Sequence, residues 1–328
     1  MDNKTTNNQE LITVGYWTLP ILLFLFQVLF TFSSFNQIRY EELAESIRNV
    51  FWLEHKAIYD GVSSNLGWYV PLLYVYRVFG FSIFTAKYVR LVISLISFLC
   101  LADLLKRLLG IGKAWLPLVT IGLSPTLVYF TSLQAQFGID LHYLMICSWL
   151  LLFTSNQKPW QRYSSQFLLG SVVLLAWSSY PAFLVYIPFL IYFYYYLQCS
   201  NNKQFSWKAL FISTILPLSG SLLILVFLIS HVNNKNLLWY DARTHAGMFR
   251  GAGQIQVNFS QVSTYFRLLT TDLFHRGASY YFELIDGEFS QIYPIMTIVI
   301  MLICMYAMLK KHQQTTFVVT ALLLILLV

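Results

Sequence analysis

Charged residues are scarce in this sequence: Asp, Glu, Lys and Arg together make up 11% of its 328 residues. Soluble domains carry about 25%, so the chain has less than half of the charge that would cover a soluble globule of its size. A soluble enzyme, a disordered protein and a nucleic-acid-binding protein are all poor interpretations. The scarcity of charge instead predicts an integral membrane protein.

Cysteine pairs, internal repeats and a cleavable leader are also missing. The four cysteines (Cys100, Cys147, Cys199 and Cys304) stand singly in or beside apolar runs, without Cys-x-x-Cys spacing. They are predicted to be buried small hydrophobes rather than disulfide partners or metal ligands. The lack of a repeat argues mildly against transporters built from duplicated halves. The first apolar run is too long for a signal-peptide core and lacks a basic start, which predicts a retained helix.

Long apolar runs fill most of the chain, since 57% of its residues are hydrophobic. A helix needs about 20 apolar residues to cross a bilayer. Candidate runs lie at 11–33, 84–105, 114–133, 138–155, 164–180, 181–198, 209–230, 292–309 and 315–328. They predict an all-α polytopic membrane protein with about 8–9 transmembrane helices. The last run would rise only about 21 Å, so we expect the chain to continue in a longer protein.

Residues 68–83 are apolar but short, with Pro71 near the start and Arg77 in the middle. They are predicted to form an interfacial or re-entrant helix rather than a span. With this assignment, 1–328 forms a single transmembrane domain. A first outer loop then covers 34–83, and a long outer loop covers 231–291.

The distribution of charge predicts the orientation. With residues 1–10 inside, the inner loops hold nine basic residues: Lys106, Arg107, Lys113, Lys158, Arg162, Lys203, Lys208, Lys310 and Lys311. The outer segments 34–67 and 231–291 hold ten acidic residues. This is the pattern of the positive-inside rule, so the N-terminus is predicted to be cytoplasmic. We expect a bacterial inner or plasma membrane rather than the endoplasmic reticulum.

The first outer loop carries an amphipathic pattern. Leu43, Ile47, Val50, Phe51 and Ile58 recur at helical spacing, opposite Glu41, Glu42, Glu45, Arg48 and Glu54. This predicts a helix lying in the membrane interface. Its acidic face is either simply solvated or contributes to a site. In the second case, Glu41 and Glu42 follow the first span, and repulsion between Glu41 and Glu45 disfavours ionisation of both. A carboxylate whose pKa is raised in this way is suited to act as a general base.

Four ionisable residues stand at the starts of predicted spans. Asp140 opens the run 138–155, where it either complements the helix dipole or serves a polar site. His142 follows two residues later, and is either a substrate-binding group or a hydrogen-bonded packing residue. Arg90, with Lys87, opens the second span. Its guanidinium either snorkels to lipid headgroups or binds a phosphate through two hydrogen bonds.

The long outer loop contains a second group of basic residues. Arg243, His245 and Arg250 lie among glycines that permit tight turns, so they are candidates to receive an anionic group. The alternative is an ordinary loop in which acidic and basic residues balance. No cofactor or metal is predicted, although a carboxylate pair could bind a divalent ion.

The order of these features resembles the N-terminal part of the C-type polytopic membrane glycosyltransferases. It is most similar to the protein O-mannosyltransferase and aminoarabinose-transferase-like group. The resemblance covers about residues 11–155. It rests on an acidic pair after the first helix, followed by Gly-Trp-Tyr-Val-Pro-Leu-Leu-Tyr at 67–74, Phe-Gly-Phe-Ser at 79–82, Lys-Tyr-Val-Arg-Leu at 87–91, Leu-Ser-Pro at 123–125 and Asp140.

The resemblance implies transfer of a sugar from a polyprenyl-phosphate donor to an acceptor hydroxyl on the outer or lumenal face. Glu41 falls at the position of the family's catalytic aspartate, and Glu42 takes the place of the neighbouring acid. Asp140 matches an acidic position in the second outer connection. The chain departs from the family in having two glutamates instead of Asp-Glu, and in keeping only Pro71 of a proline pair.

Such enzymes look like inverting, single-displacement catalysts in which a carboxylate removes the acceptor proton. Positive side chains can stabilise the departing lipid phosphate. Loop position makes Arg243 and Arg250, with Arg90, the candidates for this role. The expected partners are the donor lipid, membrane lipids and an acceptor glycan, lipid or protein.

The sequence leaves two other functional classes of membrane protein open. A polysaccharide polymerase or ligase with a lipid-pyrophosphate donor would depend on Arg243, His245 and Arg250 more than on the first-loop acids. A transporter would place charged pairs or broken helices at the midplane, whereas the ionisable residues here cluster at one interface.

Overall fold

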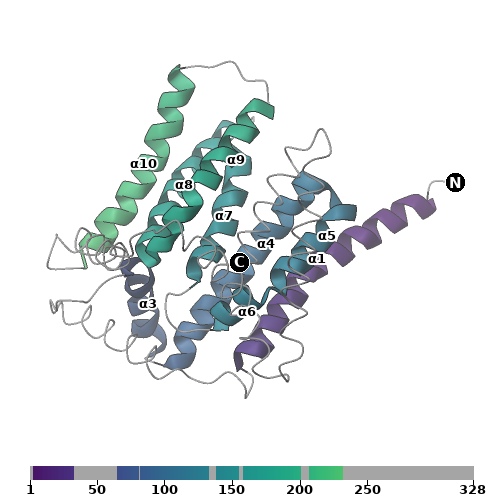
Figure 1. Cartoon of the computed structure of the whole chain (residues 1–328), viewed down its shortest axis with the longest axis horizontal. Coiled ribbons are helices and arrows are strands. Elements are labelled where there is room, and N and C mark those ends of the chain that lie inside the picture. Colours follow the sequence, from purple (N-terminus) through teal and green to yellow (C-terminus); the bar gives the residue numbers. More distant parts are fainter. Residues whose placement is uncertain are drawn as a thin grey trace, which may run out of the picture.

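The computed structural model describes residues 3–32, 65–80, 82–132, 138–154, 158–200 and 207–231. These residues are almost entirely helical and contain no strand, so the all-α prediction is confirmed for them. The elements are α1 (Asn3–Phe32), α3 (Leu66–Phe79), α4 (Ile83–Leu109), α5 (Ile111–Gly122), α6 (Pro125–Ser132), α7 (Ile139–Thr154), α8 (Pro159–Ser179), the 3-10 helix η1 (Pro181–Tyr186), α9 (Ile187–Ser200) and α10 (Trp207–Ile229) (Figure 1).

Two of the described helices are long and apolar enough to cross a membrane, by length and composition: Ile12–Phe32 in α1 and Phe84–Leu109 in α4. They match the runs predicted at 11–33 and 84–105. Shorter apolar helices lie at Ile111–Gly122, Ile139–Thr154 and Thr214–Ile229. The total of 8–9 spans stays a prediction. The runs at 292–309 and 315–328 and the amphipathic helix of the first outer loop lie outside the described residues.

The run predicted at 114–133 is two helices, which corrects the prediction of one continuous span. Helix α5 ends at Gly122, Leu123 and Ser124 form a turn, and α6 begins at Pro125. Proline has no backbone N–H to donate, and its ring disfavours the α conformation in the residue before it. Pro125 therefore starts a helix here instead of continuing one. Pro181 acts similarly, because Tyr180 before it is extended, with φ −151 and ψ 109.

Residues 68–83 form most of α3, a helix as predicted, followed by a sharp turn into α4. Gly80, at φ 80, provides the left-handed backbone that ends α3. Two residues later the Ser82 hydroxyl accepts a hydrogen bond from the Phe84 N–H at 3.2 Å and caps α4. Helix α3 lies beyond the ends of α8 and α10 (Figure 1). We call this end of the bundle the α3 end.

Polar contacts fix the directions of the central helices. Between α1 and α4, the Tyr16 hydroxyl donates to the Ala102 carbonyl at 2.6 Å, and near the other end Lys87 Nζ donates to the Thr31 carbonyl at 3.4 Å. These two helices are therefore antiparallel. Between α4 and α7, the pairs Ser97–His142 and Asp103–Trp149 run in the same order. Helices α4 and α7 are thus parallel, and both begin at the α3 end.

The outer faces of several helices are apolar. Large hydrophobic side chains are exposed along α1, α4 and α10, among them Leu22, Leu25, Leu29, Val92, Ile96, Leu218, Leu222 and Val226. Polar side chains lie inside instead, including Gln27, Ser94, Ser97 and His142, each with an exposed fraction of 0%. Soluble proteins rarely expose such continuous apolar surface. The distribution is the one expected when lipid surrounds the helices.

Candidate functional site

Three charged side chains are buried together at the α3 end. Lys87 and Arg90 stand one turn apart on α4, and Asp140 stands in the first turn of α7. Their exposed fractions are 4%, 0% and 3%. Because α4 and α7 are parallel, residues near the start of each helix meet at the same end. The sequence presented Arg90 and Asp140 as separate candidates, and the fold brings them together.

The Asp140 carboxylate is held by a tyrosine and faces a cation. It accepts hydrogen bonds from the Tyr186 side chain in η1 and from the backbone N–H groups of Asp140 and Leu141, and Arg90 is close enough to act on it electrostatically. Gly138, at φ 70, makes the turn that starts α7. The Oδ1 atom is buried and has no hydrogen-bond partner in the described part of the chain. Asp140 therefore has a lone pair available for a further donor.

The Arg90 guanidinium lies over an aromatic ring. Its Cζ atom is 5.7 Å from the centre of the Trp68 ring in α3, within the range of a cation–π contact. Trp68 is 2% exposed, and its Nε1 donor has no hydrogen-bond partner among the residues described. Helices α3, α7 and η1 thus contribute Trp68, Asp140 and Tyr186 to the same end of the bundle, and α4 contributes Lys87 and Arg90.

The position of Trp68 depends on a close helix–helix contact. A Cβ built on the neighbouring Gly67 would lie 2.4 Å from Ser178 Oγ and 2.5 Å from the Leu175 carbonyl oxygen, both in α8. Only glycine permits this approach. It sets the distance between α3 and α8, and so carries Trp68 to Arg90.

His142 is fully buried, and both of its ring nitrogens are engaged. Nδ1 lies 2.8 Å from Ser97 Oγ, and Nε2 lies 2.9 Å from Thr131 Oγ1. Each hydroxyl also lies within hydrogen-bond distance of a backbone carbonyl of its own helix. A neutral imidazole donates from one nitrogen and accepts at the other, so one hydroxyl donates to the ring and the other accepts from it. One turn before Ser97 in α4, the Ser94 hydroxyl donates to Gln27 Oε1 of α1. These contacts favour the interpretation of His142 as a hydrogen-bonded packing residue that joins α4, α6 and α7, and its substrate-binding role stays a prediction.

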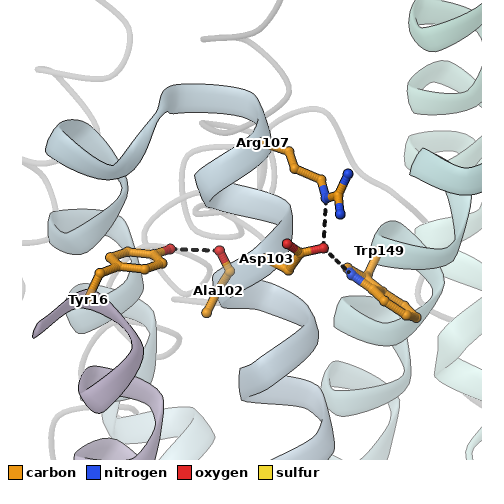
Figure 2. Close-up of polar contacts among 5 residues, drawn as sticks. All are labelled: Tyr16, Ala102, Asp103, Arg107 and Trp149. Carbon is orange, nitrogen blue, oxygen red and sulfur yellow. Dashed lines mark hydrogen bonds and ion pairs between the residues drawn. The ribbon is translucent and has the colours of Figure 1, made fainter. Parts of the chain in front are cut away.

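The opposite end of the bundle contains a carboxylate of a different kind. Figure 2 shows Asp103 Oδ2 accepting from Arg107 Nε at 2.7 Å and from Trp149 Nε1 at 2.9 Å. Arg107 lies one turn further along α4 and is about half exposed, and Trp149 comes from α7. Asp103 is therefore satisfied by two donors and ties α4 to α7, which gives it a structural role.

The remaining predicted site residues lie outside the described residues: Glu41, Glu42, Arg243, His245 and Arg250. Glu41 and Glu42 belong to the first outer loop, and the other three residues belong to the long outer loop. The described residues that flank these two loops all lie at the α3 end. Phe32 packs against Tyr88 at the start of α4, with ring centres 5.4 Å apart. Asn65 starts α3, and His231 after α10 lies 2.5 Å from the Tyr74 hydroxyl of α3. Both segments therefore connect to the bundle at the end that holds Arg90 and Asp140.

The sequence did not identify Trp68 or Tyr186 as site residues. Trp68 entered only as part of the stretch 67–74, and Tyr186 stands in an aromatic-rich run without a distinguishing pattern. Gln27, Ser94 and Ser97 did carry a signal, because polar residues inside apolar runs face a bundle interior. Cys100 and Cys147 are buried, as predicted. Within the described ranges no three His, Cys, Asp or Glu residues gather closely enough to hold a metal ion.

No protein-family model, curated protein or solved structure matches this chain.

Proposed function

We propose that this chain is a multi-pass membrane glycosyltransferase. It transfers a sugar from a polyprenyl-phosphate donor to an acceptor hydroxyl at the α3 end, which faces the outer or lumenal side. The observation that carries the proposal is the buried pair of Arg90 and Asp140 at that end. Burying a cation and a carboxylate in a membrane bundle is costly, and such residues usually mark a substrate site.

The reaction needs a cation for the departing phosphate and a carboxylate for the acceptor proton. A bond forms between the acceptor oxygen and the anomeric carbon as the bond from that carbon to the phosphate oxygen breaks. The acceptor proton passes to a carboxylate, and the electron pair leaves with the lipid phosphate. Arg90 is suited to the phosphate, because a guanidinium can donate two parallel hydrogen bonds to it. Asp140 Oδ1 is an available acceptor for a hydroxyl, and Glu41 and Glu42 are the candidates for the general base.

The proposed orientation has support at both ends of the described bundle. Lys106, Arg107, Lys113 and Lys158 all belong to the end opposite α3. Basic residues near span ends favour the cytoplasmic side. The α3 end then lies outside, where lipid-linked sugars meet their acceptors, and the N-terminus of α1 lies inside.

A transfer assay with the full chain in lipid nanodiscs tests the proposal. Wild type and the variants Glu41→Gln, Glu42→Gln, Asp140→Asn and Arg90→Gln are incubated with a membrane extract as the source of acceptor hydroxyls and with polyprenyl-phosphate hexoses and pentoses carrying a labelled sugar. Labelled acceptor and released lipid phosphate are quantified. Asp103→Asn is the matched control, since this carboxylate belongs to the opposite end of the bundle. We expect wild type and the control to release phosphate. Transfer should be lost in at least one of the two glutamate variants and reduced in the Asp140 and Arg90 variants.

Two results would contradict the proposal. Full activity in both glutamate variants and in Asp140→Asn would remove the carboxylate from the mechanism. Loss of activity only on changing Arg243, His245 or Arg250, with a lipid-pyrophosphate donor, would instead identify a polymerase or ligase.

A further inference from the structure

Two buried polar atoms at the α3 end lack partners in the described part of the chain, and both belong to residues that flank Arg90. One is the indole Nε1 donor of Trp68, and the other is the Oδ1 acceptor of Asp140. Their residues are 2% and 3% exposed. Buried indole and carboxylate atoms normally find a hydrogen-bond partner in the folded protein. Ser148 Oγ and Gln166 Oε1 also lack partners in the described part of the chain. The Trp68 and Asp140 atoms differ from these because their residues both interact with one arginine, which points to a common explanation.

The complementary chemistry of the two atoms points to a ligand. An indole N–H can only donate, and a carboxylate can only accept. A sugar carries several hydroxyl groups, each of which can both donate and accept. A sugar attached to a phosphate on Arg90 could therefore accept a hydrogen bond from Trp68 and donate one to Asp140.

We infer that Trp68 and Asp140 bind hydroxyl groups of the donor's sugar, and that they select a neutral sugar over one bearing a carboxylate. The inference rests on the proposed function and names the substrate class of that site. An acidic sugar would bring a second carboxylate beside Asp140, in surroundings with little water to screen the repulsion. Trp68 is a specificity-determining residue in this view, and the cation–π contact with Arg90 keeps its ring in place.

The substitution Trp68→Phe separates a binding role from a packing role. Phenylalanine keeps an aromatic ring beneath Arg90 but removes the N–H group. If Trp68 only packs, losing an unpartnered donor costs no hydrogen bond, and no affinity changes. If it binds sugar, affinity for the glycosylated lipid falls about tenfold, the effect of losing one hydrogen bond.

The experiment uses two probes and the full chain in nanodiscs: polyprenyl phosphate alone, and the same lipid carrying a neutral hexose. For Trp68→Phe we expect about tenfold weaker binding of the hexosyl lipid and unchanged binding of the bare lipid phosphate. The thermal midpoint of the protein without ligand should show no loss of a hydrogen bond, because the Trp68 N–H has no partner in the described part of the chain. Trp149→Phe is the matched control, because Trp149 Nε1 donates to Asp103 at 2.9 Å. The control should lower the midpoint and leave both affinities unchanged.

The outcomes separate this inference from the proposed function. Equal losses for both probes, or no loss for either, would show that Trp68 only packs, and would leave the glycosyltransferase standing. Binding of a hexuronosyl lipid as tightly as the hexosyl lipid would overturn the role of Asp140 in selecting a neutral sugar. If wild type binds neither probe, the proposed function fails and this inference fails with it.

Discussion

The contact between α3 and α8 at Gly67 allows a quantitative test of the arrangement. In Gly67→Ala, the new methyl carbon would lie 2.5 Å from the Leu175 carbonyl oxygen and 2.7 Å from the Ser179 nitrogen. Both are backbone atoms that cannot rotate away. Ordinary contact begins at 3.4 Å, so α3 must retreat by about 0.9 Å, the difference between 3.4 and 2.5 Å.

This displacement should affect both stability and the site. Overpacking of this kind costs about 1–3 kcal/mol of folding free energy. The next residue is Trp68, whose ring lies 5.7 Å from Arg90 Cζ, so the movement also displaces the ring from the guanidinium. A misplacement of about 1 Å at a reacting centre can reduce the rate about a hundredfold. We therefore expect a lower thermal midpoint together with a loss of transfer that exceeds the loss of folded protein.

The assay combines thermal unfolding in detergent with the rate of sugar transfer in nanodiscs. Gly112→Ala in α5 is the control, because a Cβ at Gly112 would meet nothing within 4 Å. Replacing an open helical glycine by alanine should leave transfer unchanged and raise stability by about 0.5–1 kcal/mol. The reasoning is refuted if Gly67→Ala unfolds at the wild-type temperature, since α3 would then not pack on α8 in this way.

Four further substitutions test the packing. Gly170→Ala places a methyl carbon 1.8 Å from the Pro217 carbonyl oxygen, so it should lower the midpoint more than Gly67→Ala; wild-type yield and midpoint would contradict the contact between α8 and α10. His142→Phe removes two hydrogen bonds in the bundle interior and should cost about 1–3 kcal/mol, whereas an unchanged denaturation curve would argue against that network. Asp103→Asn loses only an ion pair with a half-exposed arginine and should cost under about 1 kcal/mol. Asp103→Leu also leaves the Trp149 N–H without an acceptor, and should cost clearly more in the same unfolding assay.

The hydropathy of the sequence located the continuous helices correctly, but it did not show where an apolar run is interrupted. The runs at 11–33 and 84–105 correspond to α1 and α4, because a long apolar run has few alternatives to a helix in a membrane. Pro20 stays inside α1, whereas Pro125 begins a new helix. Both residues look alike in a hydropathy profile. Whether a proline interrupts a helix depends on whether the neighbouring backbone groups find other partners, and tertiary packing decides that.

The charged residues of the candidate site could be predicted from the sequence, but the way in which they come together could not. Arg90 and Asp140 stood out because ionisable residues at the starts of apolar runs are rare and costly. Nothing in the sequence places Trp68 against Arg90. That contact depends on Gly67 meeting α8, which is more than a hundred residues further along the chain. A glycine before an aromatic residue is too common a pattern to identify such an approach.

Topology explains why the buried charges gather at one end. Helix α4 runs away from the α3 end, and α5 and α6 return the chain to it, so α7 must begin where α4 began. Arg90 and Asp140 then share an end, whereas Asp103 in the last turns of α4 meets Trp149 near the other end. Both protein donors bond to Asp103 Oδ2, and the Asp103 side chain is 19% exposed, so solvent can satisfy the rest of the group. Asp140 is more deeply buried and keeps one oxygen without a partner in the described part of the chain. A purely structural carboxylate would resemble Asp103, so the difference between the two directs the search for substrate to the α3 end.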